Sequence, residues 1–129
     1  EVHCLAFFEN YEYLAKFQTI LDEKLPDIQN NVDKFGYQIV VDFEENIVYE
    51  EEKLLISALN LTINQVEQLV HSLNGIFILA HIDKTKNSII SQLGFIPVDL
   101  NVEAVEISKN TNKTEYEVVE TLSSACRCS

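Results

Sequence analysis

The sequence contains very little glycine and proline, with three Gly and two Pro in 129 residues. Average usage of roughly 7% Gly and 5% Pro would predict about 15 of the two together. This scarcity excludes collagen-like, low-complexity and linker-dominated chains. The three glycines also lie far apart, which excludes a glycine-rich phosphate-binding loop. Because no apolar run approaches the roughly 18–20 residues of a membrane-spanning helix, we expect no membrane partner.

Methionine is absent, and the chain opens with Glu1-Val2-His3-Cys4 without a signal-peptide pattern. We therefore expect these residues to be a piece of a longer protein. Cysteine is also scarce, with only Cys4, Cys126 and Cys128. The single residue between the last two is a poor spacing for a structural disulfide or a zinc knuckle. This usage predicts a reducing, cytoplasmic compartment.

Basic side chains are outnumbered, with 9 Lys and Arg against 21 Asp and Glu and a net charge of −12. Such an acidic chain is a poor partner for nucleic acid. The charge is concentrated in residues 1–52, which hold 13 acidic and three basic side chains. We interpret the run Glu50-Glu51-Glu52 as a solvated surface, because a cation site needs carboxylates that converge in space. A hydrophobic content of 47% nevertheless predicts a folded domain.

Hydrophobic periodicity in the first half of the chain predicts a strand, a helix and a hairpin. The strand is expected over residues 2–8 and the helix over 11–24, where Pro26 limits it. Two β-rich runs, 37–41 and 47–49, flank a polar turn and predict the hairpin.

The second half predicts helices that alternate with strands. Thr62 and Gln65 have the spacing of a capping box, and the helix that they begin ends at Asn74-Gly75. The unbroken apolar run 76–80 is typical of a strand buried on both faces in a parallel sheet. Weaker patterns predict an α/β fold with right-handed crossovers. They are a helix over 88–93 ended by Gly94, a strand over 102–107 and a helix over 114–122.

Two histidines are candidates for a metal site, because His3 belongs to the first expected strand and His81 follows the buried one. Neutral imidazole is the commonest metal ligand, and both rings could present a nitrogen to a shared site. Asp83 and Glu106 lie near strand ends, where they could coordinate a metal or orient a ligating imidazole. The alternative is that these are ordinary structural residues. His71 lies off the apolar stripe of its helix, and a surface position explains it.

These segments resemble the PHP (polymerase and histidinol phosphatase) domain. Residues 1–8, EVHCLAFF, resemble a strand that contributes a metal-binding histidine in that family, and 75–83, GIFILAHID, resemble its later strand ending in Ala-His. Residues 88–97 and 105–108 are similar to the segments after that later strand in one bacterial branch of PHP phosphoesterases. The resemblance makes residues 1–110 the C-terminal portion of a PHP domain and 111–129 a divergent or truncated tail.

The resemblance implies part of a distorted, seven-stranded TIM-like barrel of a metal-dependent phosphoesterase. Such an enzyme hydrolyses a small phosphorylated substrate with water activated by divalent ions, here zinc, manganese or iron. His3 and His81 would be ligands, with Asp83 and Glu106 in supporting positions. The family's other ligands would precede Glu1, and its closing Asp-x-His motif has no counterpart in the tail. We therefore expect this chain to be inactive without the missing N-terminal part of the barrel.

Two further interpretations remain open. The chain could be a non-catalytic α/β interaction module whose acidic first half docks a basic partner, or its exposed sheet edges could pair with another chain. Geometry discriminates between a metal site and an interaction module. The metal interpretation requires the imidazoles of His3 and His81 to lie within about 4–7 Å of each other.

Overall fold

The computed structural model describes residues 1–108. These divide into two compact units, one formed by Glu1–Phe17 with the chain from Thr62 onward, the other by Gln18–Leu61. The sequence patterns do not predict this division. The expected helix over 114–122 and the expected tail from residue 111 lie outside the described residues. Helix α1 (Tyr11–Lys24) has the predicted extent and passes from the first unit into the second.

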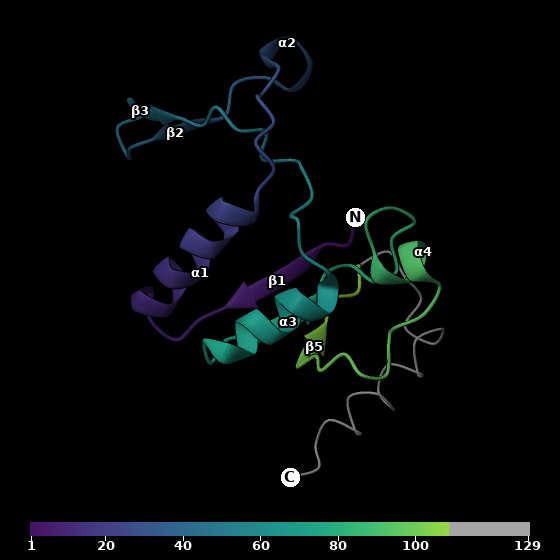
Figure 1. The fold of residues 1–129 in the computed structure, drawn as a ribbon. Coiled ribbons are helices and arrows are strands. Elements are labelled where there is room, and N and C mark those ends of the chain that lie inside the picture. Colours follow the sequence, from purple (N-terminus) through teal and green to yellow (C-terminus); the bar gives the residue numbers. More distant parts are fainter. Residues whose placement is uncertain (109–129) are drawn as a thin grey trace. The chain divides into compact units, whose positions relative to one another are not determined.

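A three-stranded sheet organises the first unit (Figure 1). It contains β1 (Cys4–Phe7), β4 (Ile76–Leu79) and β5 (Ala104–Val105) in the order β1-β4-β5. Strand β5 runs parallel to β4, as expected, but β1 runs antiparallel to it, so the prediction of a purely parallel sheet is wrong. Within residues 1–108 the sheets are open, and the partial barrel stays a prediction.

Strand β4 buries only one of its faces. Phe77 and Leu79 are fully buried, whereas Ile76 is 48% exposed and Ile78 is intermediate. The prediction that both faces are buried is therefore wrong, and the alternation is the one expected of a half-covered sheet. The largest fully buried apolar side chains of the described residues are Phe77, Leu79, Ile82, Ile89 and Val70.

Helix α3 (Ile63–Ser72) begins at the predicted capping box. Thr62 Oγ1 accepts a hydrogen bond from the Gln65 N–H at 3.3 Å, and Gln65 Oε1 accepts one from the Thr62 N–H at 2.8 Å. The chain leaves the helix through Asn74, whose φ of 52° is left-handed. At Gly75 a Cβ atom would lie 2.6 Å from Phe8 Cε1 and 2.8 Å from Val70 Cγ1, so the close approach requires glycine.

Helix α4 (Ile89–Leu93) is also confirmed, with Ser88 as its N-cap and Gly94 in the left-handed conformation at its end. The strand expected over 102–107 is shorter than predicted, because only Ala104 and Val105 pair with β4. The residues after β5 instead form hydrogen bonds with the segment that follows β4.

The second unit contains the predicted hairpin of β2 (Ile39–Val41) and β3 (Ile47–Glu50), together with the short helix α2 (Val32–Phe35), which was not predicted. Asp42 Oδ1 stabilises the turn by accepting hydrogen bonds from the N–H groups of Glu44 and Asn46, each at 2.9 Å. Hydrogen bonds from Asn46 above all lower the pKa of Asp42 below its usual value. The turn chemistry therefore specifies the hairpin locally.

Of the helices that lie within residues 1–108, none is both long enough and apolar enough to cross a membrane.

Candidate functional site

The side chains of His3 and His81 meet at one edge of the sheet. His3 directly precedes β1, and its carbonyl accepts a hydrogen bond from the Ala80 N–H at 3.1 Å. Because β1 and β4 are antiparallel, the start of one strand lies beside the end of the other. His3 Nδ1 lies 3.1 Å from His81 Nε2, and the ring centroids are 5.1 Å apart. The rings therefore meet the separation of about 4–7 Å that the metal interpretation requires, and their role as metal ligands stays a prediction.

Glu106 fixes the backbone that presents His81. Its Oε2 accepts a hydrogen bond from the His81 N–H at 3.0 Å. Its main chain bonds Leu79 O and Ile82 N, each at 2.9 Å. His81 has a φ of 32°, a left-handed conformation that side-chain-bearing residues rarely adopt and that the surrounding hydrogen bonds must maintain. Glu106 therefore orients His81 by holding the main chain of His81. The sequence predicted a contact of Glu106 with a metal or with an imidazole, and not this contact with the main chain.

Asp83 is engaged with the segment after β5. Its Oδ1 accepts a hydrogen bond from the Ser108 N–H at 2.9 Å, and its Oδ2 accepts one from the Ser108 hydroxyl. Both carboxylate oxygens of Asp83 thus tie the ends of β4 and β5 together, and its predicted role beside a metal ligand stays a prediction.

Glu1 is a member of the site that the sequence did not reveal. Its Oε1 lies 3.3 Å from Nε2 of His3, the ring nitrogen that does not face His81. A carboxylate on the outer nitrogen of an imidazole is the arrangement that fixes the tautomer and orientation of metal-ligating histidines. The spacing of two residues between Glu1 and His3 was the available signal, because extended backbone places residues i and i+2 on the same side.

The two imidazoles fit two adjacent positions of a metal centre. With Zn–N distances of about 2.0–2.1 Å, two ligands of a tetrahedral ion lie about 3.3 Å apart. The observed separation of 3.1 Å between His3 Nδ1 and His81 Nε2 is close to this value, and without a metal it is that of a direct N–H···N hydrogen bond between the rings. In addition, His81 Nδ1 is buried without a hydrogen-bond partner in the described structure.

The described residues do not complete such a centre. Burial raises the pKa of the Cys4 thiol from 9.0 to about 11, so without a metal the neighbouring sulfur is protonated at neutral pH. Across residues 1–108, no group of three or more His, Cys, Asp or Glu side chains is arranged to hold a metal ion. A catalytic zinc normally takes three protein ligands, so this edge of the sheet supplies two of them at most.

His71 belongs to a second polar cluster, which the sequence interpretation missed. Its Nδ1 lies 2.7 Å from Glu67 Oε1 and its Nε2 lies 2.8 Å from Glu103 Oε1. Glu67 is only 7% exposed, and the other oxygen of Glu103 accepts a hydrogen bond from the Phe77 N–H at 2.7 Å. The four-residue spacing of Glu67 and His71 on one helix was a detectable signal. Through Glu103, the cluster joins α3 to β4 and to the start of β5.

Comparisons of the chain with family models, with curated proteins and with solved structures found no match.

Proposed function

We propose that the chain is part of a PHP-type metal-dependent phosphoesterase, and that His3 and His81 are two ligands of its divalent metal centre. The observation that supports this proposal is the separation of 3.1 Å between His3 Nδ1 and His81 Nε2. Two residues 78 positions apart in the sequence bring ring nitrogens within hydrogen-bonding distance of each other. The proposed substrate is a small phosphate ester and the proposed compartment is the cytoplasm.

The surrounding residues have positioning roles in this proposal. Glu1 holds the outer nitrogen of His3, and Glu106 holds the main chain of His81. The hydrogen bonds of Asp83 to Ser108 keep the ends of β4 and β5 together. The remaining ligands come from residues outside 1–108, so the isolated chain binds metal weakly and does not turn over a phosphate ester.

A titration with Zn²⁺ tests the ligand pair. We expect weak, saturable binding that broadens or shifts the ring resonances of His3 and His81 in NMR spectra. His3→Ala and His81→Ala should each weaken binding about tenfold or more, equivalent to about 1.4 kcal/mol. His71→Gln is the matched control, since it removes the third histidine and leaves the pair intact. Equal affinity of the wild type and both pair variants would overturn the proposal.

A phosphatase assay with p-nitrophenyl phosphate tests the second part of the proposal. We expect no turnover above buffer with Zn²⁺, Mn²⁺ or Fe²⁺, because two imidazoles leave a centre without its further protein ligands. Turnover that EDTA abolishes, and that His81→Ala removes, would show that this chain is catalytically complete.

A further inference from the structure

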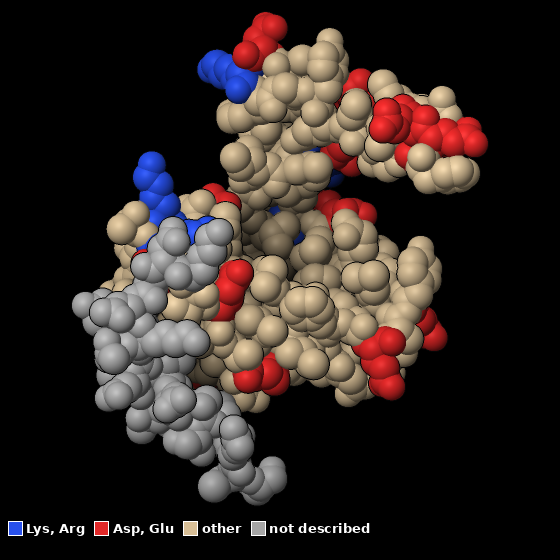
Figure 2. Space-filling model, turned by 180° about the vertical axis from the view of Figure 1, so that it is seen from behind, with Lys and Arg blue, Asp and Glu red and all other residues tan. Residues whose placement is uncertain are grey.

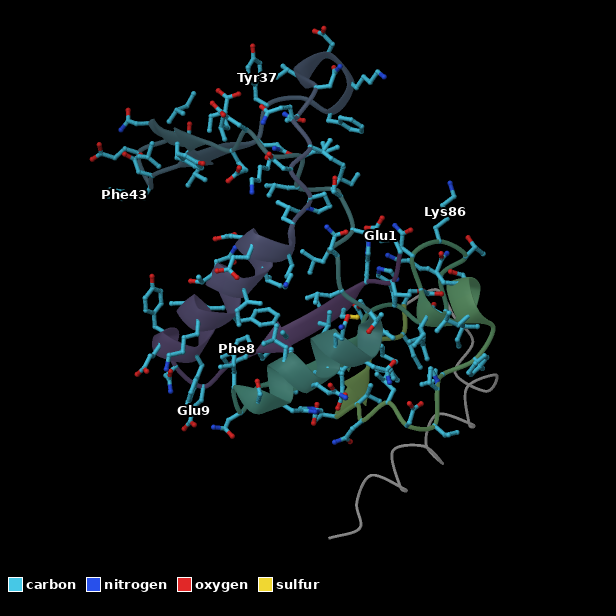
Figure 3. The ribbon with its side chains drawn as sticks, in the orientation of Figure 1. Glu1, Phe8, Glu9, Tyr37, Phe43 and Lys86 are labelled. Atoms are coloured by element: carbon cyan, nitrogen blue, oxygen red, sulfur yellow. The ribbon has the colours of Figure 1, made fainter. Side chains whose placement is uncertain are left out.

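The hairpin of β2 and β3 exposes apolar side chains that nothing in the second unit covers. Every residue of both strands is exposed, and Phe43 at the tip is 95% exposed (Figure 3). Two-stranded hairpins are marginally stable alone, and contiguous exposed apolar surface marks interaction sites. The exposed apolar side chains of this segment are Tyr37, Ile39, Val40, Val41, Phe43, Ile47, Val48 and Tyr49.

Just beyond the C-terminal end of β3, another segment of the chain lies along the outer edge, as a third strand would. Residues 28–30 lie beside residues 52–54, with a bridge between Gln29 and Lys53. The Asn30 N–H donates to Glu52 O and the Leu54 N–H donates to Ile28 O, each at 2.7 Å. After residue 31 the chain enters α2, so this third strand is not continued beside β3. In the part of the chain that the structure describes, only β2 pairs with β3.

The charge of this segment selects the kind of partner. Residues 37–52 contain six acidic side chains and no Lys or Arg. Red acidic side chains gather on this segment in Figure 2. None of the ion pairs within residues 1–108 involves them. The charge of Glu51 raises the pKa of Tyr49 most, and the charges of Glu52 and Asp22 also raise it. The surroundings of this β3 residue are therefore negatively charged. A second copy of the same hairpin would be repelled by this negative charge.

We propose that the β2–β3 hairpin is a docking site for an extended, basic polypeptide that adds a strand to the outer edge of β3. Main-chain hydrogen bonds to the open edge supply affinity in this mode of recognition, and alternate side chains supply specificity. The ligand alternates Lys or Arg with apolar residues, so that its cations face the carboxylates while its apolar side chains cover the exposed hairpin surface. The site lies in the second unit and is independent of the proposed metal centre.

The probe is a fluorescently labelled eight-residue peptide that alternates Lys and Val, titrated with the full chain and followed by anisotropy. We expect saturable binding and amide NMR shifts concentrated at residues 47–50. The double variant Glu44→Lys/Glu50→Lys should weaken binding about tenfold, since each exposed ion pair is worth up to about 1 kcal/mol. A peptide that alternates Lys and Ser, with the same charge and no apolar side chains, should bind at least about tenfold more weakly.

The matched control is Glu9→Lys/Glu12→Lys, which makes the same change in net charge within the first unit. It should bind the Lys and Val peptide as the wild type does at 0.15 M salt, where charges beyond about 8 Å are screened. Equal loss of affinity in both double variants would overturn the proposal, because it would show attraction by net charge alone. Equal binding of both peptides, or amide shifts outside the second unit, would also overturn it.

Discussion

His71 and Glu103 are joined by a 2.8 Å contact between Nε2 and Oε1, although 32 residues separate them in the sequence. The other nitrogen of His71 contacts the buried carboxylate of Glu67 at 2.7 Å. The imidazole therefore bridges two carboxylates that belong to different segments.

Removal of this bridge should destabilise the first unit. We expect His71→Ala to lower the free energy of unfolding by about 2 kcal/mol, because it leaves Glu67 buried without its partner. Urea denaturation followed by circular dichroism measures the change. The double variant His71→Ala/Glu67→Leu should recover most of the loss, since an apolar pair leaves no unsatisfied charge. A single variant as stable as the wild type would contradict the structural role of the cluster.

Glu106 should affect the geometry of the histidine pair through the backbone. We expect Glu106→Ala to lower stability by about 1–2 kcal/mol and to weaken the NMR contact between the rings of His3 and His81, because His81 loses the acceptor of its N–H. Glu106→Gln keeps a side-chain oxygen at the same position and should preserve the ring contact. If Glu106→Ala leaves the two rings in contact, the left-handed conformation of His81 does not depend on this carboxylate.

The Cys4 thiol should react slowly at neutral pH. Burial raises its pKa to about 11, so the reactive thiolate is scarce until the pH approaches that value. The folded state thus holds the proton more tightly than the unfolded state, and stability should fall as the pH rises from 9 toward 11. Alkylation by iodoacetamide, followed by mass spectrometry in a Cys126→Ser/Cys128→Ser background, measures the reactivity. The prediction would be refuted if iodoacetamide modified Cys4 at pH 7 almost as fast in the folded chain as in the unfolded chain.

Gly75 should tolerate no side chain. A Cβ atom there would lie within 3.0 Å of both Phe8 and Val70, so we expect Gly75→Ala to destabilise the first unit by about 1–3 kcal/mol. Thermal unfolding measures the loss. Phe8→Leu removes the ring atoms nearest to the added methyl group, and the double variant should therefore be less destabilised than the sum of the two single changes. If the losses of the two single variants simply add in the double variant, the clash between the new methyl group and the Phe8 ring is relieved in another way.

Local signals made α1, α3, α4 and the hairpin predictable, whereas the short helix α2 was not predicted. The capping box at Thr62 and the polar turn at Asp42 act over a few residues, and the structure contains both. The direction of β1 was not predictable, because pairing with β4 depends on contacts between residues more than about 70 positions apart. The expectation of a parallel sheet was wrong for β1, because apolar runs carry no information on strand direction.

The meeting of His3 and His81 was predicted, but the physical reason differs from the expected one. The prediction placed His81 after the buried strand and His3 within the first strand of a parallel sheet. Instead the antiparallel register brings the start of β1 to the end of β4. The contact of His71 with Glu103 had no sequence signal, because it depends on how the segment before β5 returns to α3.

The register of β1 on β4 also bears on the order in which the molecule folds. Cys4 pairs with Leu79 and Phe7 with Ile76, so β1 is synthesised long before its partner. The residues of the second unit, Gln18–Leu61, emerge in between and can complete their own local contacts first. Such non-local pairing slows folding, because a large loop must close before the strand contacts form. Strand β1 therefore cannot pair with β4 until residues 76–79 have been synthesised, and its apolar side chains are open to aggregation during that interval.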